Sequence, residues 1–183
     1  MKLIILVVVG VVSIQASAKA QTTAETIERA LAAAPRRARE EAAVIKWNAD
    51  YAYETLKEGT NRMVCFDRSD ERNRRPFAVV CTSVGNLDRA AQNRRFRMES
   101  ADGTAERAMV TAAEENGTRV LPEYGSVWIH MDGPDRASAR IHATIAVPGA
   151  TTESTGLPDN RRAGGAYIMA AGMSAAYIMI PGR

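Results

Sequence analysis

Residues 63–81 read MVCFDRSDERNRRPFAVVC, and this stretch decides how the chain can fold. Its two ends, residues 63–66 and 77–81, are rich in β-branched and aromatic side chains, which are typical of strands. The polar segment between them is typical of a surface loop. One cysteine lies in each predicted strand, so a disulfide between Cys65 and Cys81 would tie the base of the loop to the second strand.

Cys65 and Cys81 are the two cysteines of the chain, and fifteen residues separate them. A disulfide that closes a loop of this size stabilises a fold by about 3 kcal/mol if it acts through chain entropy. The alternatives are a redox site and a zinc site. The chain has no C-x-x-C motif, and two thiols at this spacing, without a nearby histidine, make a poor zinc site. The pair therefore predicts a structural disulfide.

The N-terminus has the pattern of a secretory signal peptide. Lys2 precedes ten apolar residues at 3–12, and two A-x-A cleavage sites follow at 16–18 and 18–20. A helix of ten residues is only about 15 Å long, half of the roughly 30 Å hydrocarbon core of a bilayer. We therefore expect a signal peptide at 1–20, no stable membrane anchor after its cleavage, and a periplasmic or extracellular location.

The remaining residues, 21–183, are expected to form a single secreted α+β domain, because a chain of 183 residues can enclose one core. The net charge is +3 for the whole chain, and removal of Lys2 and Lys19 leaves +1. The arginines alternate with acidic residues, as in residues 67–72, which we interpret as a solvated surface of mixed charge. The sequence thus predicts no nucleic-acid partner.

Outside the opening stretch, hydrophobic periodicity and turn residues define the other elements. A capping box at Thr22 and Glu25 predicts the start of the first helix. The sequence as a whole predicts an α+β fold, with N-terminal and central helices packed on a largely antiparallel sheet whose first three strands form a β-meander. The predicted strands are 43–47, 51–57, 63–66, 77–81, 125–131, 140–147, 166–169 and 176–179, and the predicted helices are 23–34, 36–42, 86–99 and 104–115; residues 148–165 are predicted to be a long surface loop.

The two histidines are the first candidates for chemistry, because both fall on predicted strands. Residues two apart on a strand point to the same face, so His130 and Asp132 can share one. If His142 lies opposite them, the three side chains resemble the open ligand sets of catalytic zinc or non-haem iron. They have no spacing signature of their own, and a histidine on a strand is more often a hydrogen-bonded surface residue. No cofactor is predicted.

Other catalytic motifs are missing from the sequence, which contains neither G-x-S-x-G nor a phosphate-binding glycine motif. The first hypothesis is therefore a non-catalytic extracytoplasmic binding or interaction module, whose partner is a small molecule or a protein. The alternative is a small metal-dependent hydrolase that uses His130, Asp132 and His142. The sequence leaves open whether the protein is an enzyme.

Several segments together resemble a family of uncharacterised small secreted bacterial proteins. They are LKEGTNRMVC at 56–65, Pro76 with Cys81, RIH at 140–142, and the repeated AYIM within 164–181. The resemblance implies export and a disulfide, and it brings no established activity.

This chain departs from the family at two places. Arg62 and Met63 stand where the family usually has Gly-Trp, and Tyr177 stands where it often has histidine.

Overall fold

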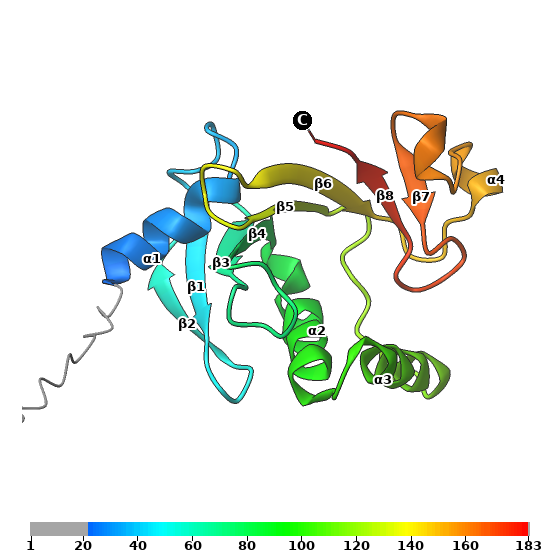
Figure 1. The fold of residues 1–183 in the computed structure, drawn as a ribbon, viewed down its shortest axis with the longest axis horizontal. Coiled ribbons are helices and arrows are strands. Elements are labelled where there is room, and N and C mark those ends of the chain that lie inside the picture. Colours follow the sequence, from blue (N-terminus) through cyan, green and yellow to red (C-terminus); the bar gives the residue numbers. More distant parts are fainter. Residues whose placement is uncertain (1–21, 183) are drawn as a thin grey trace, which may run out of the picture.

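The computed structural model describes residues 22–182, so the predicted signal peptide lies outside the described residues. Its core is one eight-stranded sheet with the strand order β2-β1-β3-β4-β5-β6-β8-β7 (Figure 1). All neighbouring strands are antiparallel except β1 and β3, which are parallel. The predicted α+β fold, with helices on a largely antiparallel sheet, is confirmed.

The elements follow the predicted order closely. The helices are α1 (Thr23–Ala30), α2 (Leu87–Glu99), α3 (Gly103–Glu115) and α4 (Thr152–Thr155), with short 3-10 turns η1 (Leu31–Ala33), η2 (Val84–Asn86) and η3 (Arg161–Ala163). The strands are β1 (Ala43–Trp47), β2 (Tyr53–Lys57), β3 (Met63–Asp67), β4 (Phe77–Ser83), β5 (Val127–Gly133), β6 (Arg140–Ala146), β7 (Tyr167–Met169) and β8 (Tyr177–Ile180).

The predicted meander of the first three strands is wrong, because β3 lies beside β1 and leaves β2 at the edge of the sheet. The chain after β2 crosses the start of β1, and the amides of Thr60 and Asn61 both donate to the carbonyl of Glu41. Gly59 makes this crossing possible, since a Cβ there would lie 2.4 Å from the backbone nitrogen of Ala43. A side chain at position 59 would therefore prevent so close an approach.

The predicted helix at 36–42 is also wrong, because residues 36–41 form turns. The guanidinium of Arg39 donates to the carbonyls of Ala32 and Ala34, and this folds the segment back on the end of η1. The surface loop predicted at 148–165 contains one helical turn, α4, which a capping box at Thr151 begins.

The disulfide Cys65–Cys81 joins directly paired residues of β3 and β4 and is fully buried. It belongs to the core between the sheet and α1 with η1, which includes Val44 and Val79. Cys81 pairs with Ile129 of β5, while the preceding residue of β4, Val80, pairs with His130. Because neighbouring residues of a strand point to opposite faces, the disulfide and His130 lie on opposite faces of the sheet.

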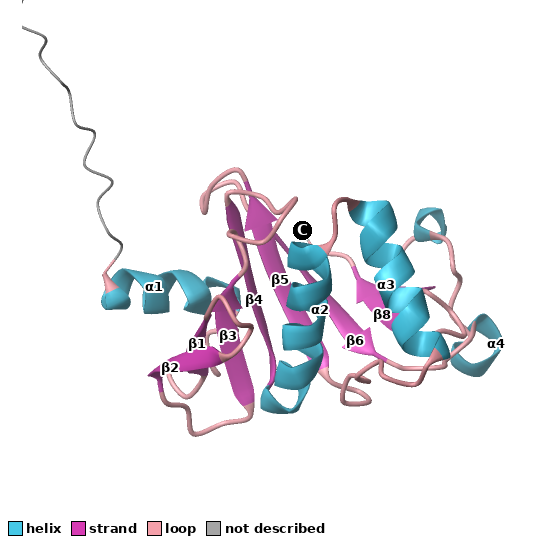
Figure 2. Ribbon diagram, turned by 90° about the horizontal axis from the view of Figure 1, so that it is seen from below, coloured by secondary structure: helices cyan, strands magenta, loops and turns pink. Residues whose placement is uncertain are grey.

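Helices α2 and α3 lie together on the face that carries His130 (Figure 2). The start of α2 is fixed by Asn86, whose side chain is fully buried. Its amide nitrogen donates to the hydroxyls of Thr82 and Ser126, at 2.8 and 2.9 Å, and its oxygen accepts from the amide of Glu123 at 2.8 Å. Asn86 therefore joins the start of α2 to β4 and to the segment that leads into β5.

Candidate functional site

The main cavity of the described residues has a volume of about 460 Å³ and lies between α2, α3 and the strands β5, β6 and β8. Its floor is the sheet face that carries both histidines, and its roof is formed by α2 and α3. Figure 2 shows these two helices lying over the sheet. Five arginines and only two acidic residues, Glu106 and Asp132, line it. We call it the guanidinium cavity. The five arginines are Arg68, Arg74, Arg89, Arg97 and Arg119.

The three side chains singled out in the sequence all line this cavity. His130 and His142 are directly paired across β5 and β6, with ring centroids 4.9 Å apart and ring planes within 15° of parallel. Asp132 follows two residues after His130 on the same face, and it pairs with Arg140. Within residues 22–182, no group of three or more His, Cys, Asp or Glu side chains is arranged to hold a metal ion. The metal site stays a prediction.

His130 is held in its neutral form. Burial lowers the pKa of this imidazole well below 6.5, and the positive charges of Arg68 and Arg74 and the neighbouring His142 lower it further. The ring of Trp128, two residues earlier on β5, lies 6.4 Å from that of His130 and within 9° of parallel to it. Trp128, His130 and His142 thus give the floor of the cavity three nearly parallel rings without a positive charge on the central one.

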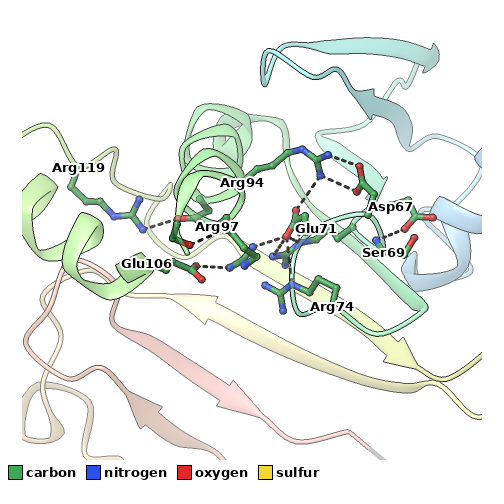
Figure 3. Close-up of polar contacts among 12 residues, drawn as sticks. Asp67, Ser69, Glu71, Arg74, Arg94, Arg97, Glu106 and Arg119 are labelled. Atoms are coloured by element: carbon green, nitrogen blue, oxygen red, sulfur yellow. Dashed lines mark hydrogen bonds and ion pairs between the residues drawn. The ribbon is translucent and has the colours of Figure 1, made fainter. Parts of the chain in front are cut away.

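One end of the cavity is held by a buried carboxylate, Glu71, in the loop between β3 and β4. Its side chain is only 2% exposed and accepts hydrogen bonds from Arg68 at 2.8 Å and from Arg97 at 2.5 Å (Figure 3). Arg74 and Arg94 lie within 3.4 and 3.6 Å of it. This network fixes the loop against the last turns of α2.

The pKa of Glu71 reports how strongly these cations act on it. Burial alone would raise the pKa, but the charge and hydrogen bonds of Arg68, together with the charges of Arg97 and Arg74, outweigh burial and lower it to about 2. For Arg74, burial and the neighbouring arginines lower the pKa to about 10. Arg97 is further paired with Glu106 of α3, at 3.0 Å. The arginines of this end therefore have carboxylate partners.

Arg89 and Arg119 line the same cavity and differ from the others, because neither makes an ion pair with any described residue. Arg89 donates to the carbonyl of Val120. Arg119 donates to the side-chain oxygens of Gln92 and Asn93, each at 2.6 Å. Both arginines are thus positioned by neutral acceptors, which leave their positive charges without a counter-ion.

The pKa values of Arg89 and Arg119 are lowered as a consequence. Burial is the main cause for both, and for Arg89 the nearby charge of Arg119 adds to it and brings the pKa to about 10. Glu114 opposes these shifts without contacting either guanidinium as an ion pair. The Nε of Arg119 is buried and has no acceptor among the described residues. A negatively charged ligand would pair with both guanidinium groups and offset the cost of removing their charges from water.

Sequence reasoning found the histidines and missed the arginines. The mixed charges of residues 67–72 were interpreted as solvated, and that interpretation is wrong for Glu71, which is only 5% exposed. Arg89 and Arg94 of α2 are buried to the same extent. The spacing of Arg94 and Arg97, three apart on a predicted helix, was the available signal, because both can then point to one side of the helix. Nothing in the sequence linked that side to the loop of Glu71.

No protein-family model, no curated protein and no solved structure matches the chain. The resemblance to small secreted bacterial proteins therefore stays a prediction. Among the helices of residues 22–182, none has the length and the apolar character needed to cross a bilayer.

Proposed function

We propose that the protein is a non-catalytic extracytoplasmic binding module, and that its ligand is a small anionic molecule held in the guanidinium cavity. The observation that carries this proposal is the pair Arg89 and Arg119, which line the cavity without an ion-pair partner among the described residues. Arg89 is only 5% exposed, and Arg119 is partly buried. A buried charge is costly to a fold unless it is paired. An anionic ligand would supply the missing partner and stabilise the native state.

The size of the cavity supports the same proposal. A volume of about 460 Å³ lies within the range of small-molecule sites, which are concave, largely apolar and carry a few convergent polar groups. Guanidinium groups suit such a site, because their planar donors match the geometry of carboxylates and phosphates.

Two observations support the extracytoplasmic location. The first is the predicted leader at 1–20, and the second is the buried Cys65–Cys81 disulfide. Disulfides form and persist in oxidising compartments and are rare in the cytosol. N-terminal sequencing of the native protein checks this part, and an intact leader with two free thiols would contradict it.

Binding is tested by calorimetric titration of the mature protein with inorganic phosphate and a panel of small carboxylates. We expect at least one of them to bind, and to raise the free energy of unfolding by about 2.7 kcal/mol at a hundredfold excess over its Kd. Arg119→Gln should weaken that binding at least tenfold. Arg107→Gln is the matched control, since Arg107 lies on α3, is exposed and does not line the cavity. Equal weakening by both variants, or no binding anion, would contradict the proposal.

The convergence of His130, Asp132 and His142 on the same cavity favours a second candidate, a small metal-dependent hydrolase. This candidate expects stoichiometric metal in the purified protein, which elemental analysis measures. It also expects that replacing both histidines with asparagine removes the metal. Binding of an anion by the metal-free protein, without turnover, would favour the binding module.

A further inference from the structure

We infer that the ligand of the guanidinium cavity is an aromatic carboxylic acid, with its carboxylate at Arg89 and Arg119 and its ring against Trp128 and His130. This inference rests on the proposed function, since it names the chemical class of the anion. Two observations support it. The two ends of the cavity differ in charge, and the rings of Trp128 and His130 lie along its floor.

The direction of α2 along the sheet shows which residues lie at each end of the cavity. The start of α2 lies near the start of β5, where Asn86 donates to Ser126. Arg89 is on the first turn of α2, and Trp128 is near the start of β5, so both lie at this end. The end of α2 lies near the loop of Glu71, with which Arg97 is paired.

The Arg89 end attracts an anion, while the other end does not. Arg119 is held by Gln92 and Asn93, so its planar guanidinium has a fixed position from which to bind a carboxylate. At the other end Glu71 and Glu106 are already paired with the arginines, and Asp132 adds a further negative charge to the lining. An acid that enters the cavity is therefore oriented with its carboxylate toward Arg89 and Arg119.

The floor next to that end is aromatic. Trp128 packs on one side against the core cluster that contains Val80 and Ala90, and it also lines the cavity. His130 continues this wall, with its ring within 9° of parallel to that of Trp128. The rings of Trp128 and His130 thus form a planar wall against which another ring can lie. Aromatic rings in contact stabilise each other beyond simple burial of apolar area.

The experiment compares three probes that differ in one property each, by titration calorimetry with the mature wild-type protein. Naphthoate has the ring and the charge, naphthamide has the ring without the charge, and decahydronaphthoate has the charge on a saturated ring. We expect naphthoate to bind at least about tenfold more tightly than naphthamide, from the charged hydrogen bonds. We expect it to bind about threefold or more tightly than decahydronaphthoate, from the aromatic contact.

Variants of the lining residues test whether these differences in affinity between the probes arise in the cavity. Arg89→Gln and Arg119→Gln should abolish the preference for naphthoate over naphthamide, while the control Arg107→Gln keeps it. Trp128→Leu should abolish the preference for naphthoate over decahydronaphthoate. Each variant is first checked for a native circular-dichroism spectrum. If one fails to fold, the three wild-type affinities still decide the inference.

The outcomes separate the two proposals. If both acids bind equally well and the amide binds weakly, the aromatic inference fails and the anion-binding function stands. If the amide binds as well as the acids, both proposals fail. If no probe binds, the aromatic inference fails, and the titrations with phosphate and small carboxylates decide the anion-binding function. Wild-type preferences that survive in the Arg89, Arg119 and Trp128 variants would also overturn the inference, because the probes would then bind elsewhere.

Discussion

Replacing Glu71 with glutamine should destabilise the protein strongly at neutral pH. The carboxylate is buried among four guanidinium groups, and their effect lowers its pKa from the ordinary 4.5 to about 2. That difference corresponds to about 3 kcal/mol of stability at pH 7. Removing one partner of a buried ion pair typically costs about 3 to 5 kcal/mol, because the other charges stay buried. We expect Glu71→Gln to lower the free energy of unfolding by that amount.

The sign of the pH dependence follows from the lowered pKa. The contribution of Glu71 is fully present above pH 4.5 and is lost as the pH falls toward 2, because the native carboxylate then takes up its proton. Urea unfolding of wild type and Glu71→Gln, followed by circular dichroism at pH 7, 5, 3 and 2, measures this. The difference between the two proteins should shrink by about 3 kcal/mol over this range.

Two results would refute this reasoning. One is a difference of less than about 1 kcal/mol at pH 7, the value of an exposed ion pair. The other is a difference that stays constant from pH 5 to pH 2. Glu54→Gln is the matched control, because Glu54 is an exposed residue of β2 at the edge of the sheet, and this variant should behave like wild type.

Three further changes test the fold. Replacing Cys65 and Cys81 together with alanine should cost about 3 kcal/mol of unfolding free energy; a loss in urea equilibria below about 1 kcal/mol would show that the bond adds little. Asn86→Ala leaves buried hydrogen-bonding groups without partners and should cost about 2 to 3 kcal/mol, whereas an unchanged urea midpoint would count against its joining role. Gly59→Ala should cost about 1 to 3 kcal/mol through its clash with Ala43, and a stable variant would mean that the crossing can shift.

The sequence predicted best what depends on neighbouring residues. The strands follow from local alternation and turn residues, and the strands predicted at 166–169 and 176–179 are β7 and β8, which pair with each other. The shared face of His130 and Asp132 follows from the two-residue period of a strand. His142 lies beside them because the predicted strands at 125–131 and 140–147 pair with each other, and His142 is directly opposite His130.

The features that the sequence did not predict depend on contacts between segments that are distant in the chain. The parallel pairing of β1 with β3 depends on a crossing at Gly59 that local pattern does not contain. The guanidinium cavity depends on where α2 and α3 lie on the sheet, and its arginines come from the loop after β3, from α2 and from the segment after α3. A polar loop such as residues 67–72 is interpreted as solvated by default, and only the tertiary structure shows that Glu71 is enclosed.

The last strand that the structure describes, β8, lies inside the sheet, between β6 and β7. Until β8 has been synthesised, β6 therefore has an unpaired edge and β7 has no neighbour to bind. Tyr177 and Met179 of β8 also line the cavity, so the cavity is incomplete until β8 has been synthesised. Shortened chains that stop before β8 should expose an unpaired strand edge and self-associate.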